Sequence, residues 1–257
     1  MVTCTSSSSG ARATEHCGTM GAMPSADLAD ASTALHAQWD RLRSWVADVV
    51  DDDVADDPSV LDGWTVAELV AHLGRAMEAL AVCVPLPEGT VPFTLGEYVG
   101  TYADRATDIA ETTRKLAAEI AHDPMAEVDA RARAAFAKLD ELGPDDLVVQ
   151  ARRGPVLLST MTVSRVLELV VHADDLARSV RRGPDPVDPG ALQLVADALL
   201  EIVVARGGWS LEIADARLWV RLAAGRQAYD VDELALALHP RYTSDGVPDL
   251  GRMLPIL

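Results

Sequence analysis

The chain has 257 residues, of which 49% are hydrophobic and 24% charged, and its formal net charge is −18. This length suits one large domain or two small ones with a real hydrophobic core. An acidic surface repels phosphate backbones and anionic lipids, so nucleic acid and membrane surfaces are poor partners. No apolar run approaches the roughly 18 residues of a membrane span, and no secretory signal pattern opens the chain.

Residues 1–24 form a polar, Ser-rich leader that we expect to be disordered. Cys4, His16 and Cys17 lie in this low-complexity segment, which makes them poor candidates for a metal site. Together with Cys83 the chain has three cysteines. Because this number is odd and two of them lie in the leader, we expect no disulfide framework and a cytoplasmic, reducing location.

Apolar spacing predicts a mainly α-helical chain. Apolar residues recur at helical intervals from Asp27 to Val50, and the acidic stretch that follows ends this helix. Thr65 and Glu68 form a capping-box pattern that begins a second helix, which runs to about Cys83. Further helices are expected at about 95–121, 125–142, 158–180, 191–205 and 215–225, with a strand over 217–223 as the alternative to the last. Short extended pieces are expected at 147–149 and 234–238.

A proline-rich linker divides the predicted elements into two groups. Residues 183–190 read GPDPVDPG, and three prolines in six residues make a stiff connection. Before it, residues 25–182 predict an up-and-down bundle of about four main helices. After it, residues 187–257 predict a small appended α/β or helical module, whose apolar end should dock on the core.

A carboxylate and an imidazole share one face of the predicted helix 158–180. Glu168 and His172 are four residues apart, and side chains at positions i and i+4 lie on the same helix face. The residues between them are apolar, and burying polar groups in such a setting is unfavourable unless something pairs with them. We interpret the two side chains as ligands of a divalent metal ion.

A third ligand is available on another helix of the predicted bundle. His72 lies beside the apolar face of the helix that Thr65 begins, and bundle cores hold metal sites built from side chains on different helices. Two imidazoles and one carboxylate suit Zn²⁺ or a similar ion, and they leave positions open for water or substrate. Asp175, three residues after His172, is placed to orient a ligand imidazole.

Each of these residues also has a purely structural interpretation. His72 is alternatively a core histidine with a backbone partner, and Glu168 is alternatively the ion-pair partner of Arg165 or Arg152. The segment also lacks the HExxH pattern, in which a glutamate between two histidines acts as base. The remaining histidines of the predicted fold lie at surface-like positions: His36, His122 and His239.

Two stretches of the sequence together resemble one known family. Residues 61–73 read LDGWTVAELVAHL, and residues 162–177 read TVSRVLELVVHADDLA. The first is similar to a GW-[ST] signature that ends in a histidine, and the second to an arginine followed by E-x-x-x-H-x-x-D. Both signatures, at about this separation, are typical of the mycothiol-dependent maleylpyruvate isomerase family of DinB-like helical bundles.

This resemblance implies a fold, a set of ligands and a chemistry. The fold is an N-terminal DinB-like four-helix bundle with a metal at its core, followed by a small α/β module. The family's metal ligands fall on His72, Glu168 and His172, with Arg165 and Asp175 as supports for them. The implied cofactors are a divalent metal, with zinc favoured, and mycothiol. A metal-bound thiolate adds to an activated double bond, permits rotation and leaves.

The resemblance also implies an arginine in the C-terminal module that holds a carboxylate of the substrate. ARLWVRLAAGRQAY offers Arg217, Arg221 and Arg226, of which Arg226 is preferred as the catalytic candidate. The same stretch resembles sterol-carrier-like proteins. The leading hypothesis is therefore a metal- and mycothiol-dependent isomerase or thiol transferase for a small electrophile, with a dicarboxylate as one possible substrate. The alternative is a non-catalytic metal- or lipid-binding protein.

Overall fold

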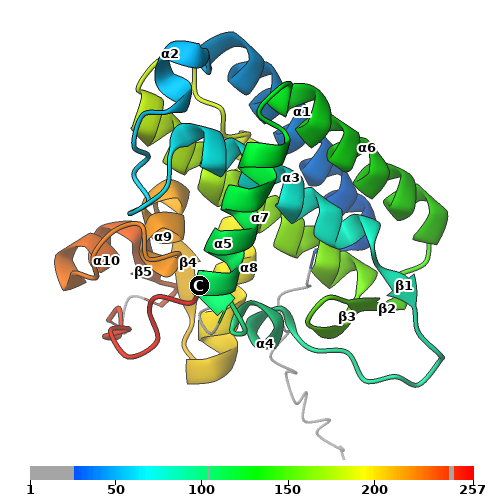
Figure 1. The fold of residues 1–257 in the computed structure, drawn as a ribbon. Helices are drawn as coiled ribbons and strands as arrows, with labels where there is room; N and C mark the ends of the chain where they lie inside the picture. Colours follow the sequence, from blue (N-terminus) through cyan, green and yellow to red (C-terminus); the bar gives the residue numbers. More distant parts are fainter. Residues whose placement is uncertain (1–25, 103–104, 243–245) are drawn as a thin grey trace, which may run out of the picture.

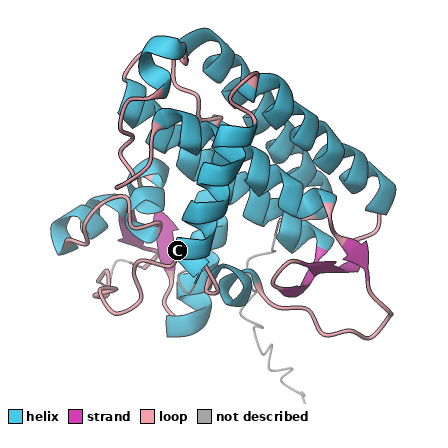
Figure 2. Cartoon of the chain, viewed as in Figure 1, coloured by secondary structure: helices cyan, strands magenta, loops and turns pink. Residues whose placement is uncertain are grey.

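The structure is a computed structural model that describes residues 26–102, 105–242 and 246–257. The leader expected over residues 1–24, with Cys4, His16 and Cys17, lies outside the described residues. Helices dominate the fold, and the short strands lie in two separate places (Figure 2). Within the described part of the chain, every helix is too short or too polar to cross a bilayer.

Four long helices form the bundle that the sequence predicts. Helices α1 (Leu28–Val49), α3 (Val66–Ala81), α6 (Pro124–Leu142) and α7 (Leu158–Val180) pack with α3 against α6 and α7, and with α1 against α7 (Figure 1). The remaining helices are α2 (Asp52–Ala55), α4 (Leu95–Val99), α5 (Ala106–Glu119), α8 (Pro189–Gly207), α9 (Ala216–Ala223) and α10 (Val231–Ala237). The mainly α fold class is confirmed.

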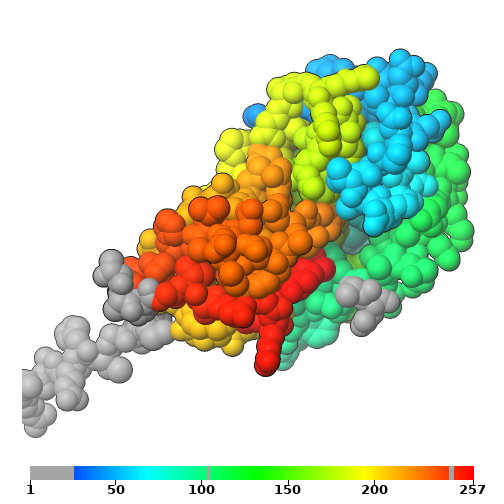
Figure 3. Space-filling view, turned by 90° about the vertical axis from the view of Figure 1, so that its left-hand side faces the viewer, coloured from blue at the N-terminus to red at the C-terminus, as the bar shows by residue number. Residues whose placement is uncertain are grey.

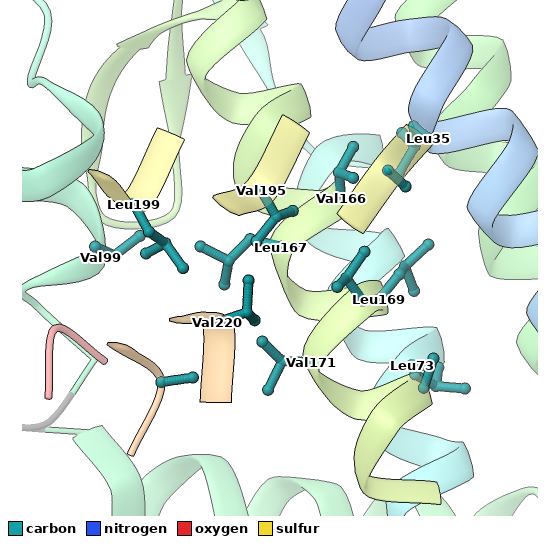
Figure 4. Close-up of a cluster of buried hydrophobic side chains, with 14 of the residues drawn as sticks. Leu35, Leu73, Val99, Val166, Leu167, Leu169, Val171, Val195, Leu199 and Val220 are labelled. Carbon is teal, nitrogen blue, oxygen red and sulfur yellow. The ribbon is translucent and has the colours of Figure 1, made fainter. Parts of the chain in front are cut away.

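Helix α7 is the central element of the molecule. Apolar side chains leave it in several directions and meet side chains of α1, α4, α8 and α9 (Figure 4). A helix that is apolar around most of its circumference is stable only when other elements surround it. The labelled residues of this cluster are Leu35, Leu73, Val99, Val166, Leu167, Leu169, Val171, Val195, Leu199 and Val220.

The expected helix over residues 95–121 is wrong, because the chain turns within it. Helix α4 ends at Val99 and α5 begins at Ala106. Gly100 has a low helix propensity, and the backbone N–H of Tyr102 donates to the carbonyl of Val99 in a tighter turn. The turn allows α5 to pack on α3, outside the bundle.

Short strands form two sheets, each at the end of a helical group. Strands β1 (Val84–Pro85), β2 (Val148–Ala151) and β3 (Gly154–Leu157) form an antiparallel sheet in that order. Of these three strands, only the middle one, β2, was predicted in part, by the extended piece expected over residues 147–149. Gly154 has φ of 139°, and a Cβ there would lie 2.3 Å from the Phe93 ring, so only glycine fits this close approach.

The C-terminal segment combines helices with a two-stranded sheet. Strand β4 (Leu211–Ile213) pairs with β5 (Leu238–Pro240). Residues 216–223 are the predicted helix, capped by Asp215, and the alternative strand is wrong. The strand expected over 234–238 is also wrong, because the Asp230 side chain accepts from the backbone of Asp232 and Glu233 and begins helix α10.

The proline-rich linker is held against the bundle. Gln38 on α1 donates to the carbonyl of Pro186 at 3.0 Å and accepts from the backbone N–H of Asp188 at 2.9 Å. The buried residues before and after the linker form one continuous apolar cluster, and Leu250, Leu254 and Ile256 belong to it. The expected docking of the chain's apolar end is confirmed, and Figure 3 shows this end (red) against the rest of the molecule. The division into two domains stays a prediction.

Candidate metal centre

The start of α3 is fixed by a side-chain cap two turns before the candidate ligand His72. The Thr65 hydroxyl accepts from Glu68 N–H at 3.2 Å while the Glu68 carboxylate accepts from Thr65 N–H at 2.9 Å, which confirms the capping box of α3. This box fixes where α3 begins and hence which residues face α7. His72 follows two turns later and points at Glu168 and His172 on α7.

The three side chains predicted as ligands converge in the buried interior. Nε2 of His72 and Nε2 of His172 each lie 3.3 Å from Oε2 of Glu168. One potential ligand atom from each residue lies within 4.8 Å of the other two. The imidazole rings meet edge to face, with centroids 4.7 Å apart. Their arrangement presents two nitrogens and one carboxylate oxygen to a common point.

The outer nitrogen of each imidazole is held by another side chain. Nδ1 of His172 lies 3.1 Å from Oδ2 of Asp175, and Nδ1 of His72 lies 3.4 Å from Oγ1 of Thr113 on α5. An imidazole that offers Nε2 to a metal carries its proton on Nδ1, and an oxygen acceptor there fixes the ring and its tautomer. The structure thus places Asp175 against His172, and its role in orienting a ligand stays a prediction, whereas no sequence pattern pointed to Thr113.

Charges in this cluster favour an ionised carboxylate. Burial alone would raise the pKa of Glu168, but hydrogen bonds with His172 and His72 and the nearby Arg165 charge hold it well below its usual range. Burial lowers the pKa of His72. Burial also disfavours the charged form of His172, but its contacts with Asp175 and Glu168 outweigh this and raise its pKa. The carboxylates of Glu168 and Asp175 on either side of His172 therefore favour positive charge at this position.

The donor set fits a divalent ion. An ionised carboxylate and two imidazole nitrogens are ligands that Zn²⁺ accepts, and three protein ligands leave a position open. Both ring orientations are already fixed by oxygen acceptors. Of the structural alternatives, the pairing of Glu168 with Arg152 is wrong, since Arg152 pairs with Glu78 at 2.7 Å, whereas Arg165 does lie within ion-pair distance of Glu168, at 3.9 Å.

Arg165 braces the helices around the site. Its side chain is buried, and it donates to the carbonyl of Ala76 on α3 at 2.9 Å and to the Tyr102 hydroxyl at 2.8 Å. A buried guanidinium needs such acceptors, because an unpaired buried charge is strongly unfavourable. Arg165 thereby ties α7 to α3 and to the turn after α4, next to Glu168.

Arg226 reaches the same region from the C-terminal segment. Its Nε donates to both oxygens of Asp175, at 3.1 and 2.9 Å. Asp175 in turn contacts His172, so Arg226 is connected to a candidate ligand through one carboxylate. The other two C-terminal candidates, Arg217 and Arg221, instead bind Asp174 at 2.9 and 2.7 Å.

An open cavity of about 720 Å³ lies beside the three candidate ligands. The bundle, α5, the β2–β3 turn and the C-terminal segment all contribute to its walls. Trp64, from the predicted motif, lies edge-on to the His72 ring at 5.3 Å and lines the cavity. Cys83, by contrast, is fully buried, does not line the cavity, and donates to the carbonyl of Ala79.

These features define a DinB-like helical protein with a candidate metal centre at the bundle core. The family model for the mycothiol maleylpyruvate isomerase N-terminal domain matches residues 35–177, more than half of the chain. The chain therefore belongs to this family. The match includes all three candidate ligands and ends before Arg226.

Two solved structures are similar to this one. A crystal structure of the mycothiol-dependent maleylpyruvate isomerase superposes with a TM-score of 0.54 at 17% identity, covering 87% of this chain and 95% of that one. A histidine-to-alanine mutant of the mycothiol-dependent maleylpyruvate isomerase gives a TM-score of 0.52 at 17% identity, covering 79% and 91%. At this identity the likeness establishes the fold. No curated protein matches the sequence.

Proposed function

We propose that this protein is a metal- and mycothiol-dependent enzyme that acts on a small electrophilic substrate by cis–trans isomerisation or thiol transfer. The observation that carries the proposal is the buried His72, Glu168 and His172 cluster at the wall of a large cavity. The cluster lies within the part of the chain that matches the isomerase family. Zn²⁺ is the favoured metal.

The chain's own residues supply the binding site and its orientation. His72, Glu168 and His172 would hold the ion, and Asp175 and Thr113 would fix the two rings. A zinc ion bound there would lower the pKa of a coordinated thiol, so that the thiol is ionised at neutral pH. The cavity leaves room beside the cluster for a thiol and a small substrate.

Cys83, the one cysteine among the described residues, is poorly suited to supply the reactive thiol. Burial raises the pKa of Cys83 to about 11, and the thiolate is the reactive form. Cys83 also has no access to the cavity. These properties support mycothiol, the cofactor named for the family and for the similar structures.

The alternative of a lipid carrier has less support. Six arginines line the cavity, at positions 75, 105, 152, 153, 165 and 226. An apolar tail would have to displace water from these charged groups, which is unfavourable. The wall is suited to a polar or anionic molecule.

The test is to add mycothiol to cobalt-substituted protein and record the absorption spectrum. A thiolate-to-cobalt charge-transfer band should develop in the wild type and be absent in a His172→Ala variant. Turnover of maleylpyruvate to fumarylpyruvate, or of other electrophiles, is then measured with mycothiol present. Absence of both thiol binding and turnover in metal-loaded protein would refute the proposal.

A further inference from the structure

The cavity wall carries far more positive charge than the molecule as a whole. The chain has a formal net charge of −18, yet six arginines line the cavity against three carboxylates: Asp108, Glu111 and Glu168. Asp108 and Glu111 are exposed residues of α5. A positive cavity attracts anions, although the acidic surface around it repels them.

Three of these arginines already have defined partners. Arg165 donates to Ala76 and Tyr102, Arg226 donates to Asp175, and Arg152 pairs with Glu78 at 2.7 Å. These contacts pair each guanidinium with acceptors of the protein itself, so they stabilise the fold. A fourth, Arg105, is exposed and adjoins residues outside the described part of the chain.

Arg75 and Arg153 are held without an acidic partner among the described residues. Arg75 makes one long contact, 3.5 Å from Nη1 to the carbonyl of Ile109. The guanidinium of Arg153 lies over the Tyr102 ring, with its Cζ 4.1 Å from the ring centroid. A cation over an aromatic face is fixed in place but keeps its donors for another ligand.

Neighbouring arginines lie close enough to Arg75 to disfavour its charge. The pKa of Arg75 is lowered by burial first and then by the charges of Arg152 and Arg153. Such repulsion in a partly buried site is relieved when an anion binds between the cations. The position of both arginines in the cavity wall and the placement of Arg153 over the Tyr102 ring also favour an anion at this site.

Helix geometry places Arg75 close to the candidate ligand His72 on α3. Arg75 is three residues after His72, so it lies about 4.5 Å further along the α3 axis. Glu78, which holds Arg152 in the β2–β3 turn, lies about 9 Å along from His72. A small molecule can therefore contact the metal site with one end and the arginines with the other.

We propose that Arg75 and Arg153 form an anion-binding subsite that takes a carboxylate of the small substrate, while the reactive end faces His72, Glu168 and His172. The assignment rests on the proposed function for the identity of the reactive end. It makes Arg75 and Arg153 specificity-determining residues, distinct from Arg226. The predicted substrate class is an electrophile with an anionic group several bonds from its reactive carbon.

The experiment measures dicarboxylate binding to zinc-loaded protein by calorimetry, with maleate as the probe. Arg75→Gln and Arg153→Gln should each weaken maleate binding about tenfold, because each removes a charge-assisted hydrogen bond. Arg75→Lys and Arg153→Lys keep the charge and should restore part of the affinity. Arg241→Gln, which removes a charge paired with Glu212 outside the cavity, is the matched control and should bind as the wild type does.

Two further probes distinguish whether the anionic group belongs to the substrate or to the thiol cofactor. Dimethyl maleate lacks charge, and its binding should not respond to either arginine substitution. Mercaptosuccinate is an anionic thiol, and a loss of affinity for it alone would place the subsite on the thiol cofactor and overturn our assignment. Equal maleate affinity in the wild type and both Gln variants would also overturn it. Zinc content and the cobalt–thiolate band are measured in parallel, so that a failed subsite is distinguished from a failed metal site.

Discussion

His172 has the most contacts that bear on the proposed chemistry. One ring nitrogen faces Glu168 at 3.3 Å and the other faces Asp175 at 3.1 Å. Arg226 then holds Asp175 from the C-terminal segment. The orientation of one candidate ligand thus depends on two residues that do not approach the metal position themselves.

Asp175→Asn should weaken zinc binding by about ten- to a hundredfold, as loss of a carboxylate behind a ligand imidazole does. The reason is that the amide can no longer accept a strong hydrogen bond from His172 while also pairing with Arg226. Competition with a zinc chelator measures the affinity.

The neighbouring Asp174→Asn is the control for this prediction. Asp174 faces Arg217 and Arg221 instead of His172, so its loss should reduce stability and leave zinc affinity within about twofold. If the two variants have equal zinc affinities, Asp175 does not support the ligand.

Cys83 should be unreactive in the folded protein. With a pKa of about 11, only about one thiol in a thousand is ionised at pH 8, and the side chain is fully buried. We expect iodoacetamide to modify the Cys83 peptide at least about a hundredfold faster in urea than in buffer. Mass spectrometry of this peptide gives the rates, and fast native modification would contradict the buried position.

At the scale of the element, helix starts were predictable where side chains cap the backbone. Thr65 and Glu68 formed a readable pattern, and Asp215 marked α9 correctly. The turn after α4 was not predictable, because only one glycine interrupts a long helical pattern there. The extended piece expected over 234–238 was wrong because Asp230 caps helix α10 there.

Thr65→Ala should destabilise the protein by about 1 kcal/mol, since the hydroxyl caps the first turn of α3. Urea unfolding measures the change. Thr33→Ala is the control, because Thr33 lies exposed within α1, donates only to the Ala29 carbonyl, and alanine is the better helix former. A Thr65→Ala variant as stable as the wild type would show that the capping box does not define the start of α3.

The candidate site was predictable only in part, because some of its residues meet only through the packing of elements that are distant in the sequence. His72, Glu168, His172 and Asp175 share periodic positions or motifs, so the sequence identifies them. Thr113 and Arg153 meet the site through the fold alone. Their contacts depend on how α5 and the β2–β3 turn pack on α3, which no local pattern specifies.

At the scale of the whole molecule, α7 joins the bundle to the C-terminal segment. Its two consecutive aspartates each bind arginines from that segment, Asp174 with Arg217 and Arg221, and Asp175 with Arg226. Asp174 and Asp175 are both buried. These ion pairs therefore fix the position of Arg226 and one wall of the cavity relative to the candidate metal centre.

Arg221→Ala should destabilise the protein by about 2 kcal/mol. The substitution leaves the buried Asp174 with one partner in place of two, and solvent screening of the 30% exposed Arg221 limits the loss. Thermal or urea unfolding measures the change. Arg182→Ala, which breaks an exposed pair with Asp51, should change stability by less than about 0.5 kcal/mol, and equal effects would contradict a structural role for Asp174.

The proposed chemistry depends on the binding of one metal ion by His72, Glu168 and His172. The most direct measurement is the metal content of purified protein by elemental analysis, for the wild type and for His172→Ala and His122→Ala. We predict about one equivalent of zinc or a similar divalent ion in the wild type and in His122→Ala, and loss of the ion in His172→Ala. Wild-type protein that binds no divalent metal, or a His172→Ala variant that retains a full equivalent, would contradict the account.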